Sequence, residues 1–598
     1  MEAILKNAYP GMPRTDYPRP MWVREEWYSL NGEWEFAFDF GRSGEERDMH
    51  RGGEYTHKIT VPFCPESELS GIGYRDFMPA VWYRKRISVE KLDGRRAILH
   101  FGAVDYESRV WVNGKLAGVH KGGYCAFEYD ITELLSEGEN TVVVSAQDDN
   151  RSWRQPRGKQ CLCYKSRVTS YTRTTGIWQT VWLEIVPETY LVCSKMTPHA
   201  ADGAIDVSVK GSSARMKDHT LKLTARYGGR EVGSAEAKFV GDRADARLTV
   251  SELHLWEVLA PEIYDLTLEL VKDGEVVDTV ESYFALRDIS FDEKGLTVNG
   301  KHVFMRLVLD QGFNPEGIYT APTAEFLKRD IELAIEAGFN GARLHQRVFE
   351  ERTLYYADHL GYMVWAEEAA GIDLSKPEAT EMFLPEWMEI FNSHYNHPAV
   401  VGWCPFNETY HEMVLHKETH TMLYRITKAL DPYRPVIDAS GGVHYETDMF
   451  DVHDYEQDPK KLYEYLEPML SDKSYFHSPI PRYRNNAPAR PEEYKGQPYW
   501  VSEYGGTTWN PDINNEGVEL FGYGDDPKTE EEFITRYEGL TDVLLSHPRV
   551  CGFCYTQITD VEQEQNGIYY YDRSRKFSDE VYARIRAVNM KTAAIEME

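Results

Sequence analysis

The sequence has 598 residues, which is too many for a single hydrophobic core, so we expect roughly two to four domains. Its composition, with 42% hydrophobic and 27% charged residues, is typical of a globular protein. The formal net charge of −31 disfavours nucleic acid and anionic membranes as partners, because both carry dense negative charge.

Targeting signals and cysteine spacing indicate the cellular compartment. The first twenty residues contain no apolar run long enough for a signal peptide, and no stretch of about 18 apolar residues occurs. We therefore expect a cytoplasmic protein that does not span a membrane. The eight cysteines show no disulfide framework. Cys551 and Cys554 form a C-x-x-C motif, but they lie in the apolar run VCGFCYTQI, so we interpret them as part of a buried strand.

The first two segments of the chain have the pattern of β-sandwiches. Residues 1–188 contain many short runs of β-branched and aromatic residues, and Asn113-Gly114 between two of them predicts a tight hairpin. This pattern predicts an antiparallel sandwich of the jelly-roll type. Residues 189–287 continue in the same style, which predicts an immunoglobulin-like sandwich, although the cysteines and tryptophan typical of antibody domains are missing.

The third segment, residues 288–598, alternates apolar strands with helices. One helix is expected after Thr323, which can cap its start, and Gly338 can end it. Eight such strands predict a parallel (β/α)8 barrel. The candidate strands cover residues 302–309, 339–345, 361–367, 400–407, 434–440, 449–455, 498–504 and 550–557.

Polar side chains stand at the ends of most candidate strands. The active site of a (β/α)8 barrel lies at the carboxyl ends of its strands, so these side chains should form one set. We expect them to line a substrate site. They are Asp310, Arg343, His345, Asn407, Glu408, His453, Tyr455, Glu503 and Gln557.

Two of these residues, Glu408 and Glu503, are carboxylates that directly follow strongly apolar runs. Two carboxyl groups on opposite sides of one bond suit glycoside hydrolysis: one protonates the leaving oxygen and the other attacks the anomeric carbon. The acid needs a raised pKa, and the nucleophile must stay ionised. A single glutamate at a strand end is more often structural, but two on one barrel, one of them preceded by Asn407, favour catalysis.

Several motifs together resemble glycoside hydrolase family 2, the group of β-galactosidases, β-glucuronidases and β-mannosidases. PRPMWVREEWYSLNGEWEF and GIWQTVWLE resemble the start and end of the family's sugar-binding jelly roll, and GFNGARLH, FNE and SEYGG resemble its barrel motifs. The resemblance covers nearly the whole chain. It implies that Glu408 is the acid/base and Glu503 the nucleophile. It also implies that Asn407 binds the 2-hydroxyl group and that Arg343 orients the nucleophile.

The sugar is less clear from the sequence. The family's glucuronidases usually carry an Asn-x-Lys pair after the eighth strand, but Ile568 follows Asn566 where the lysine is expected. Residues 151–173 contain five arginines and two lysines without an acidic residue, and Arg347 adds a further cation. Since arginine binds carboxylates well, we expect an acidic sugar, with a β-galacturonide favoured. The alternative substrates are a β-galactoside and a β-glucuronide. Alternatively, these cations do not bind substrate but pair with nearby acidic surface residues or fix a domain interface.

Other interpretations concern individual residues and the protein class. His345 and His453 are expected to contact sugar hydroxyls or to pack at strand ends, since no ligand spacing indicates a metal. Tyr455 can donate to the nucleophile or the ring oxygen, and Trp500 stacks on the sugar or belongs to the core.

We expect an exo-acting enzyme without a cofactor or metal, a small glycoside or oligosaccharide as its partner, and a possible homo-oligomer. The alternatives are a non-catalytic carbohydrate-binding protein and an endo-acting barrel.

Overall fold

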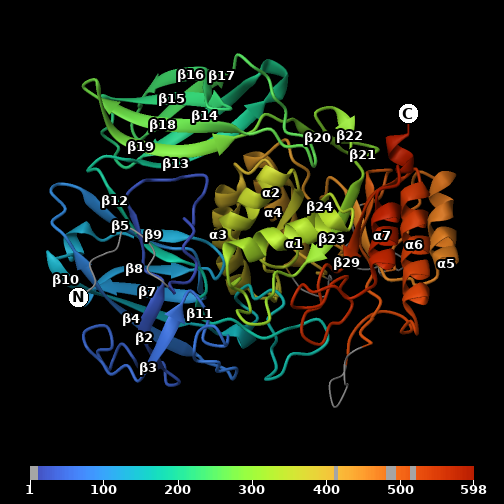
Figure 1. Cartoon of the computed structure of the whole chain (residues 1–598), viewed down its shortest axis with the longest axis horizontal. Coiled ribbons are helices and arrows are strands. Elements are labelled where there is room, and N and C mark those ends of the chain that lie inside the picture. The colour runs from blue at the N-terminus through green and yellow to red at the C-terminus, as the bar shows by residue number, and fades with distance from the viewer. Residues whose placement is uncertain (1–10, 410–414, 480–492, 512–519, 598) are drawn as a thin grey trace.

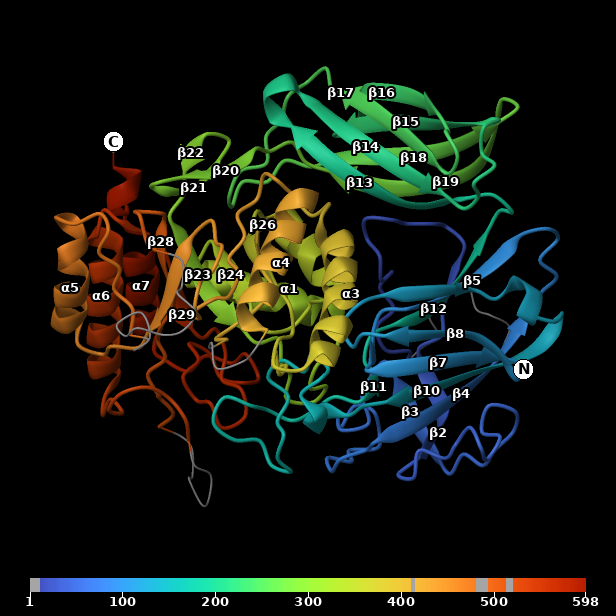
Figure 2. The same ribbon diagram turned by 180° about the vertical axis from the view of Figure 1, so that it is seen from behind.

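The computed structural model describes residues 11–409, 415–479, 493–511 and 520–597. The jelly-roll sandwich and the immunoglobulin-like sandwich pack beside the barrel, as Figures 1 and 2 show from opposite sides. The expected fold classes of all three segments are confirmed. The proposed boundaries at residues 188 and 287 stay predictions; they fall between β12 and β13 and between β19 and β20.

The jelly roll consists of a four-stranded sheet in the order β1-β12-β5-β9 and a six-stranded sheet in the order β3-β2-β4-β10-β7-β8. Its expected hairpin joins β7 to β8, where Asn113 and Gly114 have φ angles of 51° and 74°. The strands are β1 (Trp27–Ser29), β2 (Gly32–Phe38), β3 (His57–Val61), β4 (Ala80–Val89), β5 (Arg96–Phe101), β6 (Val104–Asp105), β7 (Glu107–Val112), β8 (Lys115–Lys121), β9 (Phe127–Asp130), β10 (Gly138–Gln147), β11 (Gly176–Ile177) and β12 (Val181–Val186).

The immunoglobulin-like domain packs a three-stranded sheet, β13-β14-β17, on a four-stranded sheet, β16-β15-β18-β19. Alternate residues of its strands, such as Leu221, Leu223 and Ala225, point into one shared apolar core. The strands are β13 (Leu191–His199), β14 (Ala204–Gly211), β15 (His219–Tyr227), β16 (Arg230–Lys238), β17 (Arg243–Thr249), β18 (Tyr264–Lys272) and β19 (Glu275–Phe284).

The barrel strands form one parallel sheet in the order β26-β25-β24-β23-β29-β28-β27. Thr323 caps α1 by accepting from the backbone of Phe326, as expected. A small sheet, β20 (Ile289–Asp292), β21 (Gly295–Val298) and β22 (Lys301–His302), precedes the barrel. The strands and helices are β23 (Met305–Asp310), α1 (Ala324–Glu336), β24 (Gly341–Leu344), α2 (Glu351–Leu360), β25 (Met363–Glu367), α3 (Pro377–His394), β26 (Val400–Cys404), α4 (His416–Leu430), β27 (Phe450–Asp454), α5 (Pro459–Leu466), β28 (Tyr499–Gly505), α6 (Glu530–Ser546), β29 (Val550–Thr556) and α7 (Asp579–Asn589).

The fifth expected strand, residues 434–440, makes only isolated bridges, Trp403 to Val436 and Asn407 to Ser440. It nevertheless lies between β26 and β27, because Ile437 donates to the carbonyl of Trp403 in β26 and the hydroxyl of Ser440 donates to Asp451 in β27. This irregular segment therefore occupies the place of a strand. Cys551 and Cys554 are buried in β29 as free thiols, which confirms their structural interpretation. Within the described residues, no helix combines the length and apolarity needed to cross a membrane.

Candidate active site

The two proposed catalytic carboxylates face a common space at the carboxyl ends of the barrel strands. Glu408 follows β26, Glu503 lies on β28, and His453 on β27 stands between them. The Nδ1 atom of His453 lies 2.8 Å from Oε1 of Glu408 and 3.4 Å from Oε2 of Glu503. One oxygen of each carboxylate and one nitrogen of His453 lie within 4.8 Å of one another. The fold therefore brings together side chains that are far apart in the sequence.

Glu503 is positioned as an ionised nucleophile. Its side chain is only 6% exposed, and Nη1 of Arg343 donates to it at 3.0 Å. The hydroxyl of Tyr455 also donates to it. Burial raises the pKa of Glu503, but the charges of His453 and Arg343 outweigh burial and lower it below the usual value. The carboxylate therefore carries the negative charge that attack on an anomeric carbon needs.

Glu408 differs from the expectation for the acid. Burial alone raises its pKa, but the hydrogen bond and charge of His453, with the charge of Lys159, lower this pKa to about 2. The side chain is 39% exposed, and its backbone has a left-handed φ of 48°. Glu503 and Glu408 raise the pKa of His453, although burial alone lowers it. These opposite shifts favour a proton on His453 and an ionised Glu408.

Asn407 presents an unused donor. Its Oδ1 atom accepts from Nη2 of Arg343 at 3.0 Å, which fixes the orientation of the amide. Its Nδ2 atom is buried and has no hydrogen-bond partner among the described residues. A buried donor without a partner is costly, so a sugar hydroxyl would supply the missing acceptor.

Arg343 and His345 are buried side chains that lie next to both Glu503 and Glu367. Arg343 is fully buried, and besides Glu503 it binds Glu367 at 2.6 Å. The ring of His345 lies 3.3 Å from Glu367 and 3.8 Å from Glu503. Burial and then the charge of Lys159 hold the pKa of His345 well below its usual value, so it is neutral and can accept or donate a hydrogen bond.

Four of the expected site residues are engaged elsewhere. Arg347 donates to the carbonyls of Gly312 and Tyr319, so its guanidinium is used within the fold and does not join the carboxylate pair. Trp500 is 1% exposed and its ring centroid lies 4.9 Å from that of Trp365. It stands near the start of β28, below the mouth of the barrel, and this placement does not match a sugar platform.

Asp310 and Gln557 are also buried supports. Asp310 accepts from the backbone of Gly312, and burial together with the nearby charge of Asp330 raises its pKa to about 7. Gln557 is fully buried and donates to Asn566 at 2.8 Å. Neither hydrogen-bonds to the carboxylate pair.

Three residues near the site were not singled out from the sequence. Tyr523 stacks on Tyr455 with ring centroids 3.4 Å apart, and no sequence signal marks it. Glu564 is buried and accepts from Tyr171 and Asn566. Lys159, whose charge lowers the pKa of Glu408 against burial, belongs to the basic segment 151–173, so the signal was present but did not distinguish one cation from its neighbours.

The cluster of Glu408, His453 and Glu503 has ligand atoms close enough to hold a metal ion. A metal requires a neutral imidazole, whereas the two carboxylates raise the pKa of His453. The proton on His453 therefore competes with a cation for the same place, and the donors suit proton transfer better than metal binding.

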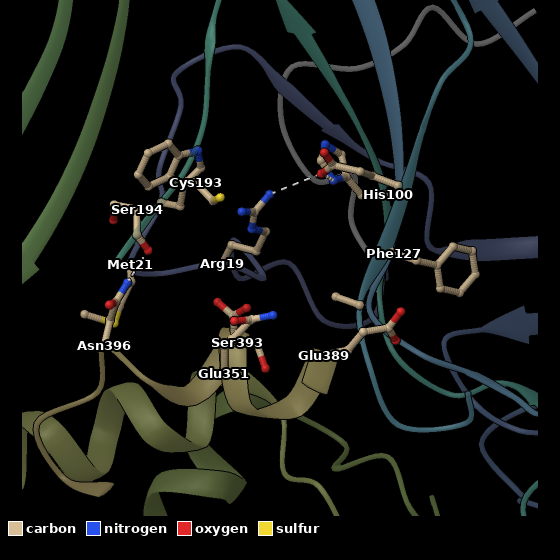
Figure 3. A pocket seen from close by; sticks show the side chains of 14 residues that line it. Arg19, Met21, His100, Phe127, Cys193, Ser194, Glu351, Glu389, Ser393 and Asn396 are labelled. Carbon is tan, nitrogen blue, oxygen red and sulfur yellow. Dashed lines mark hydrogen bonds and ion pairs between the residues drawn. The ribbon is translucent and has the colours of Figure 1, made fainter. Parts of the chain in front are cut away.

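A separate cavity of about 290 Å³ lies where all three domains meet (Figure 3). Arg19 and His100 of the jelly roll, Cys193 of β13, and Glu351 and Glu389 of α2 and α3 line it. Charged groups around it are paired: His100 on β5 binds Glu128 on the neighbouring strand β9 at 3.0 Å, and His120 on β8 binds Glu389 on α3 at 2.9 Å. This cavity contains none of the strand-end residues.

Family models match almost the full length of the chain. The sugar-binding domain of glycosyl hydrolases family 2 matches residues 27–183, a second model of glycosyl hydrolases family 2 matches residues 189–287, and the family's TIM barrel domain matches residues 289–576. The chain belongs to glycoside hydrolase family 2. The expected family and enzyme class, a retaining glycoside hydrolase, are therefore confirmed.

Individual relatives are distant. A β-glucuronidase of Bacteroides fragilis is 27% identical over 73% of this chain and 65% of its own length. A β-galactosidase of Thermoanaerobacter pseudethanolicus is 25% identical over 62% of this chain and 50% of its own. The chain thus spans about half to two thirds of the length of these curated relatives. A solved β-glucuronidase of an uncultured Clostridium shares the fold, with a TM-score of 0.77, 21% identity, and coverage of 95% of this chain and 99% of its own.

Proposed function

We propose that this protein is an exo-acting β-glycosidase that removes a terminal β-linked hexuronic acid with retention of configuration. The observation that carries the proposal is the placement of Glu503 and Glu408 around His453, with one atom of each within 4.8 Å of the others. Two carboxyl groups that share one small space fit the double-displacement reaction, in which the groups lie about 5 to 5.5 Å apart.

In the first step, the carboxylate of Glu503 forms a bond to the anomeric carbon while the bond to the leaving oxygen breaks. The leaving oxygen takes a proton from Glu408. Glu408 receives this proton from His453 along their 2.8 Å hydrogen bond. Arg343 and Tyr455 hold the attacking carboxylate in place.

In the second step, Glu408 removes a proton from water, and the water oxygen attacks the anomeric carbon as Glu503 leaves. Glu408 is ionised in the resting site, so it is ready for the role of base as soon as the leaving group departs. The amide of Asn407 donates to the hydroxyl beside the reacting carbon.

The choice of sugar departs from the β-galacturonide expected from the sequence. Similarity to proteins named β-glucuronidases favours a β-glucuronide, which was one of the alternatives. A β-galactoside remains the second candidate, because Ile568 stands in the buried core where a lysine was expected and one relative is a β-galactosidase.

Hydrolysis of nitrophenyl β-glucuronide, β-galacturonide and β-galactoside, with the product anomer followed by NMR, tests the proposal. We expect the glucuronide to give the highest kcat/KM and the β-anomer to appear first. Inversion of configuration would contradict the double displacement. A preference for the galactoside would contradict the acidic sugar while leaving the catalytic pair in place.

A further inference from the structure

We infer that Lys159, supplied by the jelly-roll domain, is the residue that binds the carboxylate of the terminal uronic acid. This inference rests on the proposed hexuronidase function. Figure 1 shows the segment that carries it, drawn in teal, extending from the jelly roll to the loops on the lower side of the barrel. The catalytic site would thus be completed by a second domain.

The segment before Lys159 is attached to the barrel beside the catalytic strands. The backbone amides of Arg157 and Gly158 both donate to the carbonyl of Ala370, at 3.1 and 2.9 Å. Gly158 has a φ of 54°, and a Cβ atom there would lie 2.1 Å from the carbonyl oxygen of Gln346. Only glycine allows this close approach, which places Lys159 near His345 at the end of β24.

The segment after Lys159 is attached on the opposite side. The carbonyl of Lys159 accepts from the amide of Tyr171 at 2.8 Å, and the hydroxyl of Tyr171 donates to Glu564 in the loop after β29. Gln563 of the same loop donates to the carbonyl of Ser170 at 3.1 Å. Lys159 is therefore held between the loops that follow β24 and β29, at the mouth of the barrel.

The ammonium group of Lys159 is left for a ligand. Its side chain makes no hydrogen bond or ion pair with any residue that the structure describes, and the residue is only partly exposed. Its charge nevertheless reaches the site, because it helps to lower the pKa of Glu408 and offsets part of the rise that burial causes in the pKa of Glu564. Position and charge both direct this cation toward the catalytic carboxylates.

The neighbouring cations are already used within the fold. Arg157 donates to the carbonyl of Gln160, and Arg173 to that of Cys161. Lys576, the buried lysine of the final loops, forms an ion pair with Asp560 at 2.6 Å. Of the cations considered at this end of the barrel, Lys159 is the one whose charge acts on the site without a partner among the described residues.

A substrate carboxylate explains why the site holds such a cation. Glu408 and Glu503 are both ionised, so a third negative charge in the sugar would be repelled unless a positive charge stood beside it. A neutral sugar has no such requirement. A lysine acts on a carboxylate as a point charge and can adjust its reach through its flexible stem.

The test compares Lys159→Met with Lys165→Met, an exposed lysine of the same segment. We expect Lys159→Met to lower kcat/KM on nitrophenyl β-glucuronide about 10- to 100-fold, mainly through KM, since one charged hydrogen bond is lost. Inhibition by free glucuronate should weaken by a similar factor, while inhibition by glucose stays unchanged. Lys159→Arg should restore part of the affinity, and Lys165→Met should match the unmodified protein.

Two results separate the inference from the proposed function. If the unmodified protein hydrolyses the glucuronide and Lys159→Met leaves its KM and the glucuronate inhibition unchanged, the role of Lys159 is overturned and the function stands. If the unmodified protein prefers a neutral galactoside, the hexuronidase function fails and the inference fails with it. Thermal unfolding of both variants shows whether a loss of affinity reflects a loss of fold. Should Lys159→Met not fold, Lys159→Gln is measured in the same assays.

Discussion

The mouth of the barrel and the cavity between the three domains both gather carboxylates and histidines, yet they differ in how those groups are satisfied. At the interdomain cavity, where Figure 3 places His100, this imidazole meets Glu128 and Glu184 through different ring nitrogens, and His120 nearby binds Glu389. At the barrel mouth, one imidazole serves two carboxylates, and a buried amide donor on Asn407 lacks a partner among the described residues. The comparison shows that residue types alone do not mark an active site. What sets the barrel mouth apart is that two carboxylates from separate strands converge on one nitrogen of one imidazole.

The largest expected effect comes from Glu503→Gln, which removes the proposed nucleophile. We expect kcat to fall by about 10³- to 10⁶-fold, as when an attacking group is lost in other covalent mechanisms. Glu351→Gln in the interdomain cavity is the matched control and should change kcat by less than about twofold. Steady-state hydrolysis of a nitrophenyl glycoside measures both. Equal losses in the two variants would erase the distinction between the two regions.

Glu408→Gln should have a smaller effect that depends on the leaving group. Removal of a general acid costs about 10²- to 10⁴-fold. Nitrophenolate leaves without much protonation, so the loss should be larger for a methyl or other alkyl glycoside. Comparing kcat/KM for the two leaving groups measures this difference. A uniform loss across leaving groups would argue that Glu408 does not donate the proton.

Asn407→Ala removes the unsatisfied donor and should lower kcat/KM by about 10- to 100-fold, because one hydrogen bond to the reacting sugar is lost. The effect should nearly vanish for a substrate that lacks the neighbouring hydroxyl. This pair of substrates, assayed with both proteins, separates a contact with the sugar from a general disturbance of the site. An equal loss on both substrates would point to the disturbance.

The smallest effect concerns stability beneath the mouth, where His444 binds Asp438 at 2.8 Å. Burial lowers the pKa of His444, but its bonds to Asp438 and Asp451 raise it to about 10. Because the pKa of His444 is higher in the folded protein than in the unfolded chain, its protonation stabilises the fold. This contribution is complete below the unfolded pKa of about 6.5 and is lost as the pH rises toward 10. The unfolding free-energy difference between the protein and His444→Gln should therefore shrink by about 1 to 3 kcal/mol from pH 6 to pH 9.5.

Urea unfolding at the two pH values measures that change. His302→Gln, at the more exposed pair with Asp292, serves as the control for replacing a paired histidine. If the unfolding free-energy difference between the protein and His444→Gln grew with pH, the predicted direction would be wrong.

Much of the site could be predicted because parallel strands end at one edge of the barrel. Arg343, Asn407, Glu408 and Glu503 follow or end apolar runs, so their clustering follows from the (β/α)8 arrangement alone. The irregular segment 434–440 was expected as a strand from its short apolar run around Val436 and Ile437, whereas the hydrogen bonds that a strand requires depend on its neighbours.

Other features depend on tertiary structure that no local pattern encodes. Trp500 has the residue type of a sugar platform, but its place near the start of β28 puts it in the core. Arg347 is held by backbone carbonyls whose positions are set by a loop. Lys159 stands out from its neighbours only once Gly158 is docked against Gln346. The low pKa of Glu408 likewise arises from His453, which comes from another strand.

The most direct test of the central claim is to trap the covalent intermediate. A 2-deoxy-2-fluoro-β-glycosyl fluoride of the preferred sugar should label the protein, and mass spectrometry of its peptides should locate the sugar. The mechanism described above predicts one sugar per chain, on the peptide that contains Glu503, and no label in Glu503→Gln. A label on Glu408 or Glu367, or turnover without any trapped sugar, would contradict it.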